Sequence, residues 1–521
     1  MHYIGHILGI TDLAKPLGLY KANIMDVTSR KPSVLIIGAG MTGILMVIKL
    51  RKAGIEDITV LEKKERIGGT WRENTYPGVA CDVPAHMYTY SFELNPNWSH
   101  FFAHGDEIQG YFEGVADKYD VNRCIRFNEA VTDARYENNK WQVTSSQNRH
   151  YEADFVVCAT GILHHPAFPN IKGLENFKGE MFHTAQWNHD QEIGPSTKVG
   201  VIGTGSTACQ SIPELVDSGA DVSVFQRTPQ WVLPLKNFRN PDRLKKLMNR
   251  FPSLARLSRN FSVFFMEHFF TKAVTGHFVQ KHLISWWCKL NLLLSIKDKA
   301  LREKLRPNYQ VGCKRIVVNT TYYKAIQKPN AHLITENIEC ITEDGVRTKD
   351  GVIHKLDVLV LSTGFHPMNY MRPMNLIGRA DLHIDDAWSD QIKTYRSMMM
   401  PNYPNFFLMH GPNTPIGNFS VIAMSEVQCG YILKMIEAWQ RSEYDEAEAT
   451  PEAVQTFNAY IKDGLKGTAW VGGCQSWYLD KKGDPILWPY TWGQWVKEMR
   501  EPEFSDMRLT KYQNSQSKEA A

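Results

Sequence analysis

The chain has 521 residues, of which 43% are hydrophobic and 22% are charged. This composition predicts a globular protein with a sizeable core, and the length suggests about three domains. The formal net charge of +4 is small for such a chain. It argues against nucleic acid as the main partner, because a nucleic-acid-binding face needs concentrated Lys and Arg.

The nine cysteines are scattered, and none forms a CxxC pair. In a long chain this pattern predicts free thiols in a reducing compartment such as the cytoplasm, and it argues against a zinc site or a redox dithiol. Residues 1–30 lack the order of charge, apolar core and small residues of a signal peptide, so we interpret them as an N-terminal extension. No run of about 18 apolar residues occurs, which argues against a membrane-spanning helix.

A first glycine-rich turn follows the apolar residues 33–37 (SVLII), which are typical of a buried parallel strand. The turn contains Gly38, Gly40 and Gly43, and it leads into a predicted helix and a second strand that ends in Glu62. In such a unit the three glycines allow a tight turn, close approach of a pyrophosphate, and packing of helix on strand. The unit therefore predicts a dinucleotide site, with the acid placed to bind ribose hydroxyls.

The same pattern returns after residues 198–202 (KVGVI), where the turn reads Gly203-Thr204-Gly205-Ser206-Thr207-Ala208. Glu62 lies 24 residues after Gly38, and Arg227 lies 24 residues after Gly203. An acid at this place repels a 2′-phosphate, whereas a guanidinium pairs with it. The first site is therefore predicted to take FAD or NAD, and the second to take NADP.

Two similar segments predict how the domains are connected. Residues 154–161 and 357–364 each consist of an acid, an apolar strand and Thr-Gly, and they bracket the second glycine-rich unit. A domain inserted within another needs two such crossings. We therefore expect an α/β fold with two Rossmann-like domains, in which the NADP domain is inserted in the FAD domain. The expected parts are an extension (1–30), an FAD domain in two pieces (31–165 and 359–521), and an NADP domain (166–358) with a helical insertion at about 240–300.

The predicted helical insertion contains an apolar stretch at 261–295. One interpretation is a helical pair that faces the core, and the others are a wall for an apolar substrate or a patch that touches membrane. The run Met398–Met400 is a second candidate for a pocket lining, because methionine adapts to irregular shapes. Both features suggest bulky apolar substrates.

Between the two crossings lies Phe177-Lys-Gly179-Glu-Met-Phe-His183-Thr-Ala-Gln-Trp187-Asn188. This segment resembles the FxGxxxHxxxW(P/D) fingerprint of Baeyer–Villiger monooxygenases, with Asn188 at the place of Pro or Asp. The resemblance extends over nearly the whole chain after residue 30. We expect His183 and Trp187, which would share a face if helical, to pack the hinge between domains rather than to perform chemistry.

The resemblance also implies site residues. Residues 68–82 resemble the segment that lines the flavin, residues 226–229 the NADPH-phosphate motif, residues 312–315 (GCKR) the segment of the active-site arginine, and residues 476–489 the C-terminal part of several members. The implied cofactor-binding residues, in addition to those of the two turns, are Glu62, Gly69, Thr70, Trp71, Asp82, Tyr88, Val131, Gln210, Arg227 and Thr228.

The family's activity implies that NADPH reduces FAD, that O2 forms a peroxyflavin, and that this attacks a ketone to give an ester or lactone. Such chemistry needs a fixed cation beside the flavin, because negative charge develops where water is excluded. Arg315 is the candidate cation, and Asp82 is the candidate to orient it. No metal is expected.

Three alternatives remain at this point. A flavin monooxygenase that oxygenates nitrogen or sulfur shares the folds, but its fingerprint ends in Tyr or Phe where this chain has Trp187. A pyridine nucleotide–disulfide reductase needs two cysteines beside the flavin, where Cys81 stands alone. A non-enzymatic flavin-binding protein would need neither the second glycine-rich unit nor Arg315.

Overall fold

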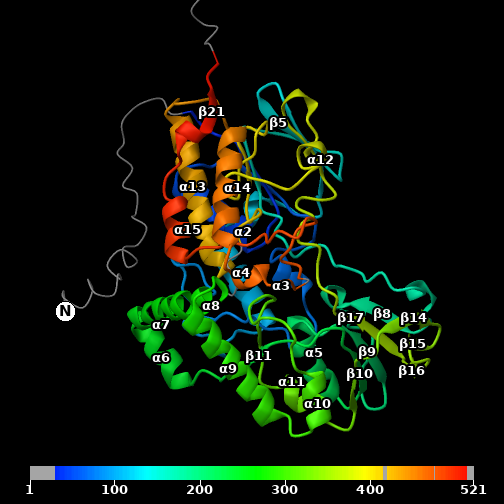
Figure 1. The fold of residues 1–521 in the computed structure, drawn as a ribbon. Coiled ribbons are helices and arrows are strands. Elements are labelled where there is room, and N and C mark those ends of the chain that lie inside the picture. The colour runs from blue at the N-terminus through cyan, green and yellow to red at the C-terminus, as the bar shows by residue number, and fades with distance from the viewer. Residues whose placement is uncertain (1–29, 415–418, 475, 513–521) are drawn as a thin grey trace, which may run out of the picture.

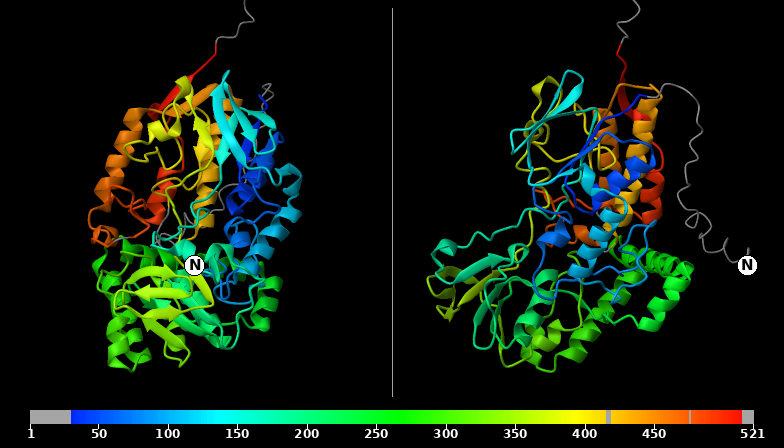
Figure 2. Two further views of the ribbon diagram at one scale, coloured as in Figure 1. Left: turned by 90° about the vertical axis from the view of Figure 1, so that its right-hand side faces the viewer. Right: turned by 180° about the vertical axis from the view of Figure 1, so that it is seen from behind.

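The computed structural model describes residues 30–414, 419–474 and 476–512, and the predicted extension lies outside them except for Arg30. The first and last parts of the chain form the upper half of the molecule in Figure 1, and the middle part forms the lower half. Figure 2 shows the same division from two further sides. Among the described residues, no helix combines the length and apolar character needed to cross a bilayer.

The upper half is built on a five-stranded parallel sheet. Its strands, in spatial order, are β19 (Phe406–Leu408), β7 (Phe155–Cys158), β1 (Val34–Ile37), β2 (Ile58–Leu61) and β3 (Ile125–Arg126). Helices α2 (Met41–Lys52) and α13 (Val421–Gln440) pack against each other beside this sheet. The predicted strand–turn–helix–strand unit is confirmed, because β1, α2 and β2 follow in that order.

The lower half contains a second five-stranded parallel sheet. Its order is β13 (Ala331–Ile334), β10 (Asp221–Phe225), β9 (Lys198–Ile202), β17 (Val358–Leu361) and β8 (Glu180–His183). Helix α5 (Ser206–Asp217) connects β9 to β10, and α11 (Tyr322–Ala325) packs on α5. The second predicted unit is therefore also confirmed. Four apolar strands of these sheets (β1, β7, β9 and β17) are buried almost throughout, as parallel strands covered on both faces should be.

Smaller elements complete the two halves. The antiparallel partners are β4 (Val131–Glu137), β5 (Lys140–Ser145) and β6 (His150–Ala153), then β14 (Ile338–Thr342), β15 (Gly345–Thr348) and β16 (Ile353–Lys355), and β20 (Glu446–Ala449) with β21 (Met507–Thr510). β18 (Asn375–Ile377) adds to β4 in parallel, and β11 (Val232–Leu233) pairs with β12 (Val317–Val318). The remaining helices outside the insertion are α3 (Thr70–Glu73), α4 (Gly105–Lys118), α12 (Ile384–Ala387), α14 (Pro451–Leu465) and α15 (Trp492–Glu498).

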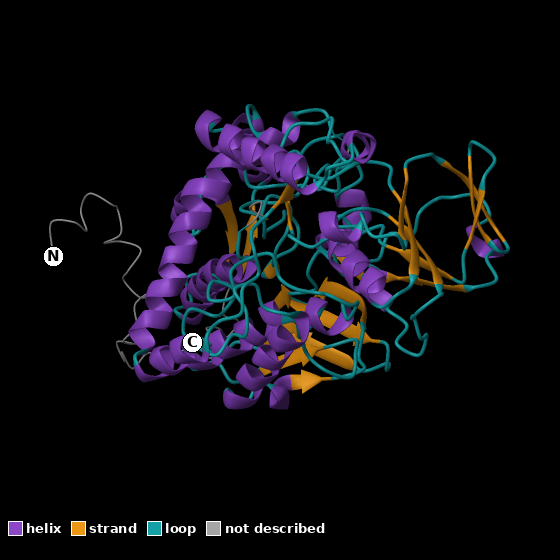
Figure 3. Ribbon diagram, turned by 90° about the horizontal axis from the view of Figure 1, so that it is seen from below, coloured by secondary structure: helices purple, strands orange, loops and turns teal. Residues whose placement is uncertain are grey.

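The helical insertion lies between β10 and β13. It comprises α6 (Asp242–Arg250), α7 (Pro252–Phe265), a π-helical turn (Met266–Thr271), α8 (Lys272–Val274), α9 (Phe278–Ser295) and α10 (Lys299–Lys304). Seen from below, its helices α6 and α7 lie on the side opposite to β14–β16 (Figure 3). Met266, Phe270 and Ile284 enter the same core cluster as the residues around α2 and α13, which confirms that one side of the helices faces the core. Glu267 accepts a hydrogen bond from the Trp492 N–H at 3.0 Å and so joins the turn to α15.

The Met398–Met400 run is fully buried, and its side chains belong to two core clusters. These methionines therefore fill the core and give no support to the predicted pocket lining. The physical reason is that they precede β19, a strand buried on both faces.

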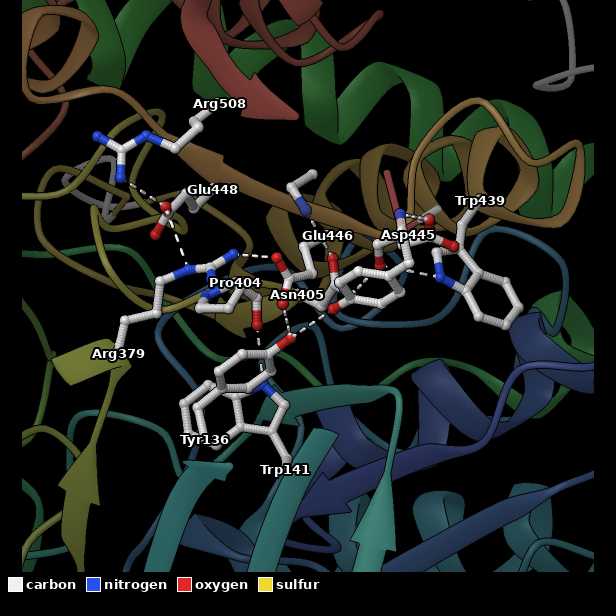
Figure 4. A network of polar contacts seen from close by, with 12 residues as sticks. Tyr136, Trp141, Arg379, Pro404, Asn405, Trp439, Asp445, Glu446, Glu448 and Arg508 are labelled. Atoms are coloured by element: carbon white, nitrogen blue, oxygen red, sulfur yellow. Dashed lines mark hydrogen bonds and ion pairs between the residues drawn. The ribbon is translucent and has the colours of Figure 1, made fainter. Parts of the chain in front are cut away.

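A buried polar network holds β20 against the small antiparallel sheet (Figure 4). Glu446 contacts the Tyr136 hydroxyl and the Arg379 guanidinium, and Glu448 pairs with Arg508 at 3.1 Å. Both glutamates are only 1% exposed. Because a buried carboxylate without partners would be costly, these contacts are needed for the strand to lie where it does.

Candidate functional site

Both glycine-rich turns adopt the geometry that their sequences require. Gly38 and Gly203 have φ values of +102° and +115°, which disfavour any residue with a side chain. A Cβ on Gly43 would lie 2.0 Å from the Gly38 carbonyl oxygen. At the matching position of the second turn, Ala208 is fully buried, so there the packing accommodates one methyl group.

The turns leave two helix N-termini open to a phosphate. α2 begins after Gly40 and α5 begins after Gly205, and no side chain caps either helix. Gly69 lies across from Gly40, where its added Cβ would be 3.1 Å from the Gly40 Cα. A cradle of this kind, with free N–H groups and no side chains, fits a pyrophosphate.

The two strand ends carry opposite charges, as the spacing predicts. Glu62 is 3% exposed, and its Oε2 accepts a hydrogen bond from the Ala39 N–H at 2.8 Å, beside the first turn. Arg227 is exposed just after β10. Burial, and after it the charge of Arg227, lower the pKa of Lys314, whose ammonium lies 5.1 Å from the centroid of the Tyr309 ring. These two cations fit a doubly charged phosphate better than one does.

Lys314 is a cofactor-binding candidate that the sequence did not single out, although it stands in the GCKR segment. The signal that could have found it is the second cation immediately before Arg315 in that segment. Arg315 donates to Asp82, whereas the Lys314 ammonium lies over the Tyr309 ring.

The other predicted cofactor-binding residues lie near the two glycine-rich turns, where several of them contact one another. Trp71 donates to the Tyr88 hydroxyl at 3.1 Å, and that hydroxyl lies 3.7 Å from the Met41 sulfur at the start of α2. Thr70 begins α3 after Gly69, and Val131 begins β4 in the core cluster that contains Leu61. At the second turn, Thr204 donates to the Thr228 carbonyl at 2.8 Å.

One set of contacts connects the two turns. Gln210 on α5 donates to the Ala80 carbonyl at 3.0 Å and accepts from the Tyr76 hydroxyl at 2.8 Å. Thr207 also contacts Tyr76, whose pKa burial raises to about 12. The segment that precedes Asp82 is therefore fixed on the helix of the second glycine-rich unit.

Asp82 and Arg315, 233 residues apart, form the bidentate pair that the sequence argument anticipates. Arg315 donates through Nε to Oδ2 at 2.8 Å and through Nη2 to Oδ1 at 2.5 Å. Their side chains are 13% and 31% exposed. Burial lowers the pKa of Arg315, but the Asp82 carboxylate raises it more, so the guanidinium stays charged. The result is a fixed cation that still presents part of its surface.

The expectation that all cysteines are free is wrong. Cys313 and Cys474 form a disulfide with a Cα–Cα distance of 6.3 Å, and the other seven cysteines, including Cys81, are free. The pair is separated by 161 residues. No local motif marks it, because only the folded chain brings the C-terminal segment against the GCKR segment.

Tyr478, four residues after the bridge, adds a further contact to Arg315. It is 2% exposed, and burial raises the pKa of its hydroxyl while the Arg315 charge lowers it. The C-terminal segment thus closes over the ion pair.

His183 and Trp187 do not share a helix, since β8 ends at His183 and a short 3-10 turn, Thr184–Gln186, follows. The His183 ring lies between Phe168 and Phe365, with centroid distances of 5.7 and 5.8 Å. Trp187 packs on Phe182. His183 therefore packs between the two crossing segments, since Phe168 follows the first crossing and Phe365 follows the second.

Comparison with known proteins gives consistent results. A family model described as pyridine nucleotide-disulphide oxidoreductase matches residues 35–249. An uncharacterized monooxygenase of Mycobacterium tuberculosis is 40% identical over 89% of this chain and 93% of its own length. A Baeyer–Villiger monooxygenase of Pseudomonas aeruginosa is 35% identical over 89% of each chain.

A solved structure shows the same fold with both cofactors present. It is that of the OTEMO complex with FAD and NADP, which superposes with a TM-score of 0.82 at 26% identity and covers 92% of this chain and 100% of its own. With the two glycine-rich units, the Asp82–Arg315 pair and these similarities taken together, the chain belongs to the family of Baeyer–Villiger monooxygenases.

Proposed function

We propose that this protein is an FAD- and NADPH-dependent monooxygenase that inserts one oxygen atom of O2 next to the carbonyl of an apolar ketone, giving an ester or lactone. The observation that carries this proposal is the bidentate pair between Asp82 and Arg315. The pair would supply a permanent cation to a protein with two dinucleotide sites, one that suits FAD and one that suits NADPH.

FAD, once reduced by NADPH, supplies the electrons that activate oxygen, and the protein supplies position and charge. The first glycine turn and Glu62 would hold FAD, and the second turn with Arg227 and Lys314 would hold NADPH. Gly69, Thr70 and Trp71 would contact FAD from α3. This assignment is supported by the close approach of Gly40 and Gly69, which leaves a space that a single Cβ would fill.

Arg315 would stabilise the negative charge that develops on oxygen during transfer to the ketone. Asp82 would hold the guanidinium plane in place through two hydrogen bonds, so that little reorganisation is needed during the reaction. Tyr478 and the Trp71–Tyr88 pair would help to exclude water from this cation, because all three rings are at least half-buried.

The same assignment gives a domain organisation. We place the FAD domain in residues 31–165 and after β17, with the NADP domain between them. The boundary lies after Leu361 rather than at 358, because β17 pairs with β9. Two hydrogen bonds between the crossing segments support this division: the Ala167 N–H donates to the Gly364 carbonyl at 2.8 Å, and Thr363 donates to the Ala167 carbonyl at 2.6 Å.

We place the enzyme in the cytoplasm, where NADPH is supplied. The disulfide is unusual for that compartment. Mass spectrometry of thiols alkylated in intact cells would show whether Cys313 and Cys474 are paired there.

The test of the proposed function is to purify the flavin-loaded protein and to supply linear, cyclic and steroid ketones with NADPH. NADPH oxidation that rises with a ketone, together with a product one oxygen atom heavier, is expected. Arg315→Ala should keep its flavin and lose about 10²–10³ of the product rate. Oxidation of amines or sulfides without any ester from the ketone panel would overturn the proposal.

A further inference from the structure

The helical insertion carries an apolar surface that nothing in the described part of the chain covers. Most of the large apolar side chains that are exposed in the described residues lie between Phe238 and Leu294. On α7, Leu257 and Phe261 are 64% and 67% exposed, and on α9, Trp286 is 61% exposed. Monomeric soluble proteins seldom expose so many apolar side chains in one region, and where they do, the region commonly binds a partner or a membrane.

The exposed side chains follow helical spacing, so they form faces rather than scattered points. Leu257, Phe261 and Phe264 are related by four and seven residues on α7, and all three are exposed. The same spacing relates Val279, Leu283 and Trp286 on α9. We call these six residues the apolar face.

α9 is apolar on two opposite sides, and among the described residues only one of these sides has a packing partner. Ile284, Cys288 and Leu292 occur at spacings of four, are buried, and face the core. The stripe through Leu283 and Trp286 lies on the other side of the helix. A helix that served only to cover the core would carry polar residues there.

The charge around the apolar face is mainly positive, although Asp242 begins α6 and Asp298 follows α9. Glu267 is the only acidic residue between Arg243 and Lys297, while ten Lys and Arg residues occur from Arg243 to Lys297. Glu267 itself is engaged with the Trp492 N–H. Exposed cations lie on both helices of the apolar face and on the neighbouring α6: Arg256 on α7, Lys289 on α9 and Arg250 on α6.

From the combination of these features, we infer that the outer surface of α6, α7 and α9 docks on an anionic lipid membrane. Amphipathic helices with aromatic and aliphatic side chains beside Lys and Arg lie in the interface plane of a bilayer. Their cations are attracted to anionic headgroups. A second copy of this chain is a poorer partner, because it would bring two surfaces of the same positive charge together.

The three helices lie along one edge of the molecule, at the lower left of Figure 1 and the lower right of the right-hand view in Figure 2. Docking by this edge leaves the sheets and both glycine turns away from the lipid. The attachment is peripheral, since no described helix can cross a bilayer. It does not depend on the proposed function.

The experiment is co-sedimentation of the full-length, flavin-loaded protein with vesicles of phosphatidylcholine, with and without phosphatidylglycerol. Binding to the anionic vesicles should be at least about tenfold stronger and should fall as salt rises. The variant Leu257→Gln/Phe261→Gln/Trp286→Gln should bind them at least about tenfold more weakly. Its matched control, Val352→Gln/Ile353→Gln/Leu509→Gln, removes exposed apolar side chains elsewhere and should bind as the parent does.

A second variant, Arg250→Gln/Arg256→Gln/Lys289→Gln, separates charge from apolar contact, since it should lose the preference for anionic vesicles. Circular dichroism and flavin content check that each variant is folded. Parent protein that does not bind either vesicle overturns the inference, as does an apolar-face variant that binds like its control. Dimers in vesicle-free solution that the apolar-face variant abolishes would assign the surface to a second copy instead.

Discussion

The substitution Asp82→Asn tests whether the carboxylate positions Arg315. Two hydrogen bonds of 2.8 and 2.5 Å join the side chains, and the amide of Asn can accept only one of them, without charge. A charge-assisted hydrogen bond contributes about 1.5–3 kcal/mol. Because Arg315 is 31% exposed, water replaces part of this, and we expect a loss of about 1.5 kcal/mol, or about tenfold in product rate.

The assay follows NADPH consumption and ester formation separately. We expect Asp82→Asn to lower ester formation while the KM for NADPH and the flavin content stay unchanged, because both hydrogen bonds that the Asp82 carboxylate accepts come from Arg315, and Asn keeps the size of the side chain beside the flavin. The matched control is Asp154→Asn, since Asp154 is similarly buried (16% exposed) and accepts two hydrogen bonds from Ser33.

Asp154 lies just before β7, at the opposite end of the strands from the glycine turns, so its variant should keep full activity. Parent-like ester formation in Asp82→Asn would refute the positioning role. A loss of flavin or of thermal stability in step with activity would show that the pair is structural rather than functional.

Three further predictions follow. Arg227→Ala and Lys314→Ala should each raise the KM for NADPH about tenfold and leave the KM for NADH unchanged, since NADH lacks the phosphate; an equal rise for both nucleotides would refute the assignment. Cys474→Ser should lower kcat/KM for the ketone about threefold with normal flavin content, and a reductant should do the same to the parent enzyme but not to this variant. Glu446→Gln should lower the free energy of unfolding by about 2 kcal/mol at pH 7. Burial raises the pKa of the Glu446 carboxyl, but hydrogen bonds and an arginine lower it more, so that it lies below the usual 4.5. The stabilisation by this carboxylate is therefore present above pH 4.5 and is lost as the pH falls through the lowered pKa. Denaturation curves at pH 7 and in acid should show that the difference between parent and variant disappears in acid.

The sequence predicted those parts of the fold whose determinants are local. A tight turn needs glycine at Gly38 and Gly203, and a strand buried on both faces needs an uninterrupted apolar run, so each unit can be recognised within about 30 residues. The charge difference between Glu62 and Arg227 also depends only on spacing along one unit.

Features that depend on distant segments were predicted only by resemblance or not at all. The Asp82–Arg315 pair spans 233 residues and came from the family's pattern. The disulfide was missed, because nothing near Cys313 indicates that Cys474 will lie against it. The sequence also could not show which side of α9 is exposed, because the helix carries apolar residues on two opposite sides and either side could face the core.

The disulfide between Cys313 and Cys474 closes a covalent loop that runs through both halves of the molecule. The enclosed segment contributes β13 and β17 to one sheet and β19 to the other, so neither sheet can separate fully while the bridge is intact. Closing a loop of 161 residues removes roughly 5 kcal/mol of chain entropy from the unfolded state. The oxidised enzyme should therefore melt as one unit, and a protease cut within the loop would leave a two-chain protein whose halves remain together until a reductant is added.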